Sequence, residues 1–189
     1  MARQGGLREY MSEAWKRLWF DGFTSSAAVA VTAALRSRIE GRSVWKPINA
    51  ISHIVWGRHA ARRGERTFRY TGTGLVLNLA ACVFWAACYQ AWRRTMPRPD
   101  SFLTTAAIGA GTSAIAYITD YHLVSHRFTP GFELSLSRRS FPWIYGALAA
   151  GLFLSEWLGI ASATGYLQPK RHQGASLPHP RKSAGSDAD

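Results

Sequence analysis

Long stretches without any charged residue are the dominant pattern along this chain. Residues 71–92 and 101–119 contain no Asp, Glu, Lys or Arg, and residues 140–168 contain one charged residue, Glu156. A helix needs about 20 apolar residues to cross the hydrocarbon core of a bilayer. Backbone in hydrocarbon is satisfied only in a helix or a closed barrel, and these stretches are too long and too rich in Ala and Leu for barrel strands. The pattern predicts an all-α integral membrane protein.

Four membrane-spanning helices are predicted along the chain. Their expected ranges are 18–35, 71–92, 101–120 and 140–160. They belong to one domain, residues 18–168, which we expect to fold as a four-helix bundle. Residues 1–17 form a cytoplasmic N-terminal segment, and residues 169–189 form a polar tail whose Pro, Gly, Ser and His content predicts disorder.

The first of these spans is the least apolar. It contains Asp21 and follows Lys16 and Arg17, so it also fits a cleaved signal peptide with residues 28–30 as the cleavage site. We favour a retained span, because the aromatic residues at its start are typical of a membrane interface. The cleavage site would also fall inside the apolar run.

The distribution of basic residues bears on both orientation and partners. The net charge of +12 invites a nucleic-acid interpretation, but most Lys and Arg residues flank the spans, where they meet lipid headgroups. We therefore expect no nucleic-acid partner. Four spans put the termini and the 93–100 loop on one side, with 11 Lys and Arg against 12 on the other. Only the basic pair Lys170 and Arg171 favours cytoplasmic termini. The excess of Arg over Lys, 19 to 4, is typical of a GC-rich bacterial genome, and we expect a multi-pass protein of the bacterial inner membrane.

The segment between the first two spans is longer than a simple connector. Residues 46–56 have helical periodicity, with Ile48 and Ile51 on an apolar arc and Asn49 and His53 on a polar one. This pattern predicts a short amphipathic helix lying in the membrane interface. Basic residues that would contact lipid headgroups accompany it: Lys46, Arg58, Arg62, Arg63, Arg66 and Arg69. A solvated basic loop is the alternative.

Two carboxylates, Asp21 and Glu156, fall within predicted spans at similar depth. A charge facing lipid is costly, so Glu156 should pair with a basic residue just past the second span, Arg93 or Arg94. This interpretation makes the carboxylates structural. The alternative is a proton-linked small transporter in which Glu156 and Asp21 carry the proton.

A second polar group gathers on the other side of the predicted membrane domain. Its members are His53, Asp120, His122, His126, Arg127 and Glu133. His122 and His126 are four residues apart, so a continuing helix would place them on one face, where Asp120 or Glu133 could complete a zinc or iron site. We favour the simpler interpretation, in which Asp120 and Arg127 form an ion pair that closes the loop. No catalytic residue and no cofactor is assigned.

Two motifs resemble a known group. Residues 42–57 read RSVWKPINAISHIVWG, and residues 120–133 begin DYH and end RFTPGFE. Together they resemble an uncharacterised group of small four-span bacterial membrane proteins, over about residues 18–160. The resemblance implies the same topology and singles out His53, Asp120, Arg127 and Glu133. It implies no reaction.

These observations favour a non-enzymatic membrane protein that acts through lipids, anionic ones among them, or through protein partners. The alternatives are the proton-linked transporter and a membrane metalloprotein built on His53, Asp120, His122 and His126. A homo-oligomer and a hetero-oligomer both fit the sequence.

Overall fold

Helices make up all the regular structure of the described chain. The computed structural model describes residues 2–98 and 101–166, and no strand occurs within them. The long helices are α1 (Ala2–Ile39), α4 (Thr73–Arg93), α5 (Phe102–Ile118) and α6 (Phe141–Tyr166). Three helical stretches are long and apolar enough to cross a membrane: Met11–Ile39, Phe68–Arg93 and Phe102–Leu123. The all-helical prediction is confirmed. The predicted disordered tail at 169–189 lies outside the described residues.

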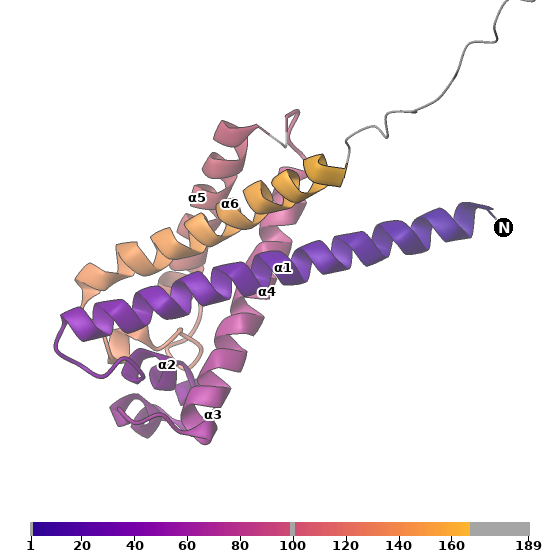
Figure 1. Cartoon of the computed structure of the whole chain (residues 1–189). Coiled ribbons are helices and arrows are strands. Elements are labelled where there is room, and N and C mark those ends of the chain that lie inside the picture. The colour runs from indigo at the N-terminus through magenta and orange to yellow at the C-terminus, as the bar shows by residue number, and fades with distance from the viewer. Residues whose placement is uncertain (1, 99–100, 167–189) are drawn as a thin grey trace, which may run out of the picture.

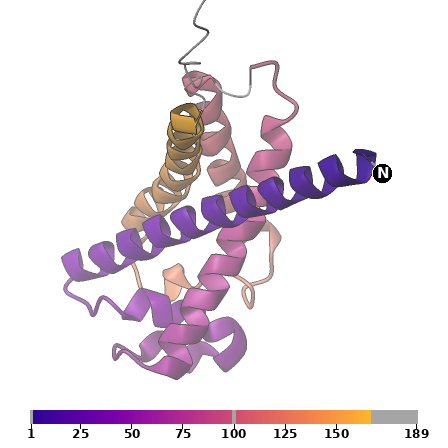
Figure 2. The same ribbon diagram turned by 45° about the vertical axis from the view of Figure 1, so that its right-hand side comes forward.

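The long helices pack around α1 and α6. These two helices contact each other extensively, α4 crosses α1, and α5 packs on α6 (Figures 1 and 2). The N-terminal part of α1 projects beyond its neighbours in both views. Val29, within the stretch that resembles a cleavage site, is 5% exposed and belongs to the core. The first apolar segment is therefore an integral part of the packing.

Glycines allow the helices to approach closely. A Cβ placed on Gly22 would lie 2.4 Å from a methyl of Val83, and one on Gly151 would lie 2.6 Å from the Cα of Ser25. Small residues at such positions let helix backbones pack tightly where hydrocarbon supplies no hydrophobic drive for association. The close α1–α4 and α1–α6 contacts therefore require glycine at these two positions.

Short elements fill the connections at one end of the long helices, the lower end in Figure 1. Between α1 and α4 the chain forms α2 (Lys46–Ile51), α3 (His53–Trp56), η1 (Arg58–Arg62) and η2 (Phe68–Gly72). Between α5 and α6 it forms η3 (Thr119–Leu123), η4 (Phe132–Leu134) and η5 (Arg138–Ser140). We call this the loop end.

The amphipathic segment is helical but does not present its apolar arc to lipid. Ile48 and Ile51 are 3% and 4% exposed, and Asn49 and His53 from the expected polar arc are buried as well. The expected lipid contact of Ile48 and Ile51 is therefore wrong, because α2 packs its apolar face against α4 and α1. Helical periodicity identifies an apolar face but does not distinguish a lipid neighbour from a protein neighbour.

Glu40, at the end of α1, ties this helix to the start of α6. Its carboxylate accepts hydrogen bonds from the hydroxyls of Ser137 (2.7 Å) and Ser140 (2.6 Å) and from the Ser137 backbone N–H, and Arg42 lies 3.5 Å away. Burial acts to raise the pKa of Glu40, but these hydrogen bonds and the Arg42 charge outweigh it and lower the pKa.

The crossing of α2 over α4 gives a prediction for Gly74. A Cβ at this position would lie 2.0 Å from the Ile48 carbonyl oxygen, whereas a Cβ on Gly146 in α6 would meet nothing within 4 Å. Gly74→Ala should lower the stability of the detergent-solubilised protein by about 1–3 kcal/mol, and the matched control Gly146→Ala should not lower it. Equal melting temperatures for the two variants would contradict the crossing.

The Glu40 cluster gives a pH prediction. Its folded-state pKa is below the unfolded value, so its contribution is present above the ordinary glutamate pKa of about 4.3 and is lost as the pH falls through the folded-state pKa. Glu40→Gln should melt at a lower temperature than wild type at pH 7, and the gap should narrow towards pH 3. Exposed Glu65, replaced by Gln, is the control and should show no such gap.

Candidate functional site

Both carboxylates of the predicted spans, Asp21 and Glu156, belong to one buried polar cluster where α1, α4 and α6 meet. Glu156 on α6 forms an ion pair with Arg93 on α4, and Arg17 on α1 lies 3.4 Å from the same carboxylate. The side-chain amide of Gln90 donates to Asp21 and also reaches Glu156 at 3.5 Å. We call these five residues the charge cluster.

The charge cluster confirms the predicted ion pair between Glu156 and Arg93. It also confirms that Asp21 and Glu156 lie at similar depth, because the Gln90 amide contacts both. Arg17 was missed, because the first span was expected to begin after it. An Arg on a helix can reach along its apolar surface to a buried group. The cluster balances two acids with two bases. A neighbouring cavity of about 330 Å³ is lined by Arg17 and Gln90, and neither Asp21 nor Glu156 lines it. The geometry is that of a buried ion pair.

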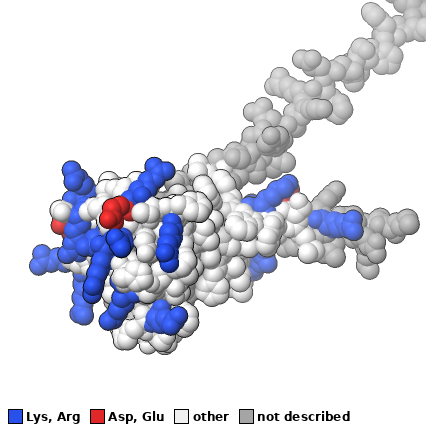
Figure 3. Space-filling view, turned by 90° about the horizontal axis from the view of Figure 1, so that it is seen from below, with Lys and Arg blue, Asp and Glu red and all other residues white. Residues whose placement is uncertain are grey.

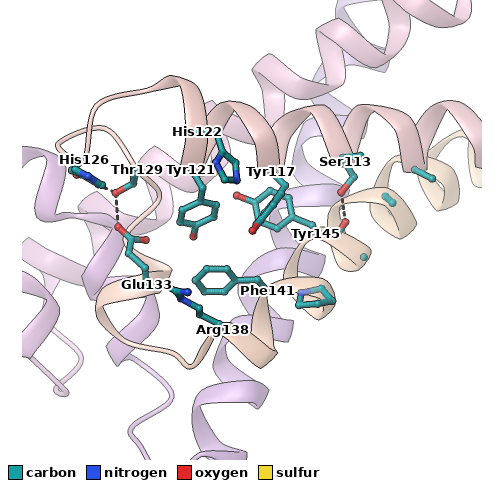
Figure 4. A pocket seen from close by; sticks show the side chains of 15 residues that line it. Ser113, Tyr117, Tyr121, His122, His126, Thr129, Glu133, Arg138, Phe141 and Tyr145 are labelled. Atoms are coloured by element: carbon teal, nitrogen blue, oxygen red, sulfur yellow. Dashed lines mark hydrogen bonds between the residues drawn. The ribbon is translucent and has the colours of Figure 1, made fainter.

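A groove of about 740 Å³ lies between α5 and α6 (Figure 4). Small residues line its deep part, away from the loop end: Ala110, Ala114, Gly146 and Ala149. Polar residues line its other part at the loop end: His122, His126, Thr129, Glu133 and Arg138. The groove is therefore apolar away from the loop end and polar at the loop end, and we call it the α5–α6 groove.

Aromatic rings form the middle of this groove. Tyr121 stacks on Phe141 with ring centroids 4.9 Å apart, and Tyr117 packs edge-on against Tyr145 at 5.3 Å. The hydroxyl of Ser113 donates to the Tyr145 carbonyl and links α5 to α6. This arrangement holds the two groove walls in fixed register.

Asp120 lies behind this aromatic layer. Its carboxylate accepts a hydrogen bond of 2.6 Å from the Tyr145 hydroxyl. Within the described chain no ion pair joins Asp120 to Arg127, which is exposed. The predicted loop-closing pair is therefore wrong: the chain turns after Leu123, and the tyrosine on α6 takes the place expected for the arginine.

The predicted helical face with His122 and His126 is also absent. η3 ends at Leu123, and Val124 is extended (φ −84°, ψ 153°), so the four-residue spacing is not helical. Both histidines line the α5–α6 groove, and the Thr129 hydroxyl donates to Glu133 there. Among the described residues no three His, Cys, Asp or Glu side chains are close enough to hold a metal ion.

His53 takes no part in the groove. It is buried, and its Nδ1 lies 2.9 Å from the Ala50 carbonyl oxygen. Gly131 (φ +84°) passes so close that a Cβ there would lie 2.9 Å from this nitrogen and 2.5 Å from that oxygen. The ring therefore helps to join α2 to the 124–134 loop, and only glycine fits opposite it.

The basic segment after α3 is held by an unexpected residue, Asn49. Its buried amide donates to the carbonyls of Arg63 (3.1 Å) and Glu65 (2.8 Å) and accepts from the Thr71 hydroxyl (2.7 Å). The polar side chain was expected on an exposed face, so no sequence signal pointed to this role.

The arginines of this segment are exposed, and Lys46 is half-buried. Arg69 lies 4.1 Å over the Trp56 ring and Arg66 lies 5.5 Å over the Trp45 ring. Figure 3 looks onto the loop end, where Lys and Arg side chains gather with few acidic neighbours. We call the exposed Lys and Arg side chains of the loop end the basic surface; Arg58, Arg62 and Arg63, which follow α3, are exposed members of it.

Comparisons of the chain with protein-family models, with curated proteins and with solved structures gave no match.

The charge cluster predicts that substitution of its two acids, Glu156 and Asp21, has different effects on stability. Removal of one partner from a buried ion pair costs about 3–5 kcal/mol, so Glu156→Gln should leave the protein inserted but clearly less stable in detergent. Asp21→Asn is the control, because Asp21 contacts the neutral amide of Gln90 and should tolerate the change better. Wild-type stability of Glu156→Gln, with loss of a proton-coupled flux in vesicles, would instead support a carrier.

Proposed function

We propose that this chain is a multi-pass, non-enzymatic protein of the bacterial inner membrane that binds an anionic phospholipid in the α5–α6 groove. The main support for this proposal is the change of lining along the groove, from small apolar residues away from the loop end to basic and hydrogen-bonding residues at the loop end. A phospholipid shows the same change along its length, from apolar acyl chains to a polar headgroup. The volume of the groove is in the range of small-molecule sites, about 300–1,000 Å³.

Each end of the groove suits a different part of the lipid. Arg138 is exposed at the polar end and presents a planar fork of donors that suits a phosphate. Glu133 accepts from Thr129 and would accept from the hydroxyls of a glycerol headgroup. The acyl chain would lie against Ala114 and Gly146, where no large side chain blocks it.

The basic surface supports the choice of an anionic lipid. Each Lys or Arg near a membrane surface contributes about 1 kcal/mol of attraction to anionic headgroups. Twelve such residues belong to the loop-end segments, against four acids, Glu40, Glu65, Asp120 and Glu133. This excess would raise the local concentration of anionic lipid around the mouth of the groove.

The proposal includes α6 as a fourth span. This helix has 26 residues, and Glu156, its one charged residue, is paired with Arg93. Neutralisation of its only charge lowers the cost of placing α6 in hydrocarbon. The loop end, with α2 and α3, would then lie at one membrane interface.

Lipid binding gives a prediction for Arg138. Native mass spectrometry of the purified protein should show one retained phosphatidylglycerol in preference to phosphatidylcholine. Arg138→Ala should weaken this binding about fivefold, which corresponds to about 1 kcal/mol. Arg127→Ala removes a nearby exposed arginine that does not line the groove and should have little effect. Equal effects of the two variants would indicate general charge attraction and contradict a specific site.

A further inference from the structure

A second cavity lies on the inner side of Tyr145, which lines both it and the α5–α6 groove. It has a volume of about 290 Å³, roughly twice that of a dry apolar cavity of about 150 Å³ that accepts benzene. Aliphatic residues from α1, α2, α4 and α6 line most of it. Four aromatic side chains complete its walls: Trp85, Phe128, Phe132 and Tyr145.

One carboxylate, that of Asp120, lines this apolar cavity. It accepts a hydrogen bond from the Tyr145 hydroxyl, and among the described residues it forms no ion pair with Lys, Arg or His. A carboxylate accepts several hydrogen bonds, so capacity remains after this one. A carboxylate without a cationic partner in an apolar cavity is unfavourable and marks a site where a positive charge is stabilising.

Two polar donors that line the cavity are already engaged inside the protein. The Asn78 amide donates to the backbone carbonyl (3.0 Å) and the hydroxyl (2.8 Å) of Ser26, and the Tyr145 hydroxyl donates to Asp120. Their remaining polar atoms are acceptors. Asp120 is the one side chain with a formal charge among the residues that line the cavity, and its negative charge disfavours an anionic ligand.

We propose that this cavity binds a small lipophilic ammonium ion, whose positive nitrogen lies between the Asp120 carboxylate and the aromatic walls. Rings of Trp, Tyr and Phe attract cations through their faces, and quaternary ammonium groups are recognised by such aromatic enclosures. The apolar body of the ligand would pack among Ile51, Ile144 and Leu148. This site is separate from the lipid groove, since Tyr145 stands between the two.

The test is equilibrium dialysis of the detergent-purified full chain with radiolabelled benzyltrimethylammonium. Saturable binding of one cation per chain is expected. Asp120→Asn keeps an acceptor for Tyr145 but removes the charge, and it should weaken binding at least tenfold. Glu65→Gln is the matched control, because it neutralises an exposed carboxylate that lines neither the cavity nor the α5–α6 groove, and binding should be unchanged.

Two further comparisons keep the test decisive if Asp120→Asn does not fold. Phe128 is 58% exposed, so Phe128→Leu should fold and should weaken binding severalfold by removing one aromatic face. Neopentylbenzene, the neutral carbon analogue of the probe, should compete poorly on the wild-type protein. Absence of saturable binding, equal loss in Glu65→Gln, or equal competition by the neutral analogue would overturn the proposal.

Discussion

The ion pair between Glu156 and Arg93 sets the position of α6, and the rest of the structure depends on that position. Both side chains are almost fully buried, with 1% and 7% exposure. A buried charge without its partner is strongly destabilising, so sliding or rotating α6 against α4 is penalised. Arg17 and Gln90 extend the constraint to α1 and Asp21. One cluster therefore fixes three helices at one end of the molecule.

The consequence appears at the other end of α6. Tyr145 precedes Glu156 by eleven residues, about 16 Å along the helix axis. With α6 held in register, the Tyr145 hydroxyl meets Asp120 at the end of α5 and its ring separates the α5–α6 groove from the inner cavity. Glu40 clamps the start of α6 to α1. The shapes of both cavities follow from polar contacts at the two ends of one helix.

Sequence reasoning succeeded where the physics is local. The cost of charge in hydrocarbon predicted the all-helical class, the span now seen as α4, and the pairing of Glu156 with Arg93. It failed where the position of a side chain depends on which other elements pack against it. The burial of Ile48 and Asn49 depends on α2 packing under α4, and periodicity alone does not show that. The partner of Asp120 is 25 residues away on another helix, so proximity in sequence wrongly favoured Arg127. The α5–α6 groove and the inner cavity arise where several helices meet, and no single helix carries a sequence signal for them.

A double-mutant cycle on the charge cluster tests the central claim most directly. Wild type, Glu156→Gln, Arg93→Gln and the double variant would be unfolded in the same detergent, and the coupling energy taken from the four stabilities. We expect a coupling energy of about 2 kcal/mol or more, with the double variant more stable than the sum of the two single losses requires, because neither charge is then left unpaired. Additive losses, within about 0.5 kcal/mol, would show that the pair does not hold the helices and would contradict the account.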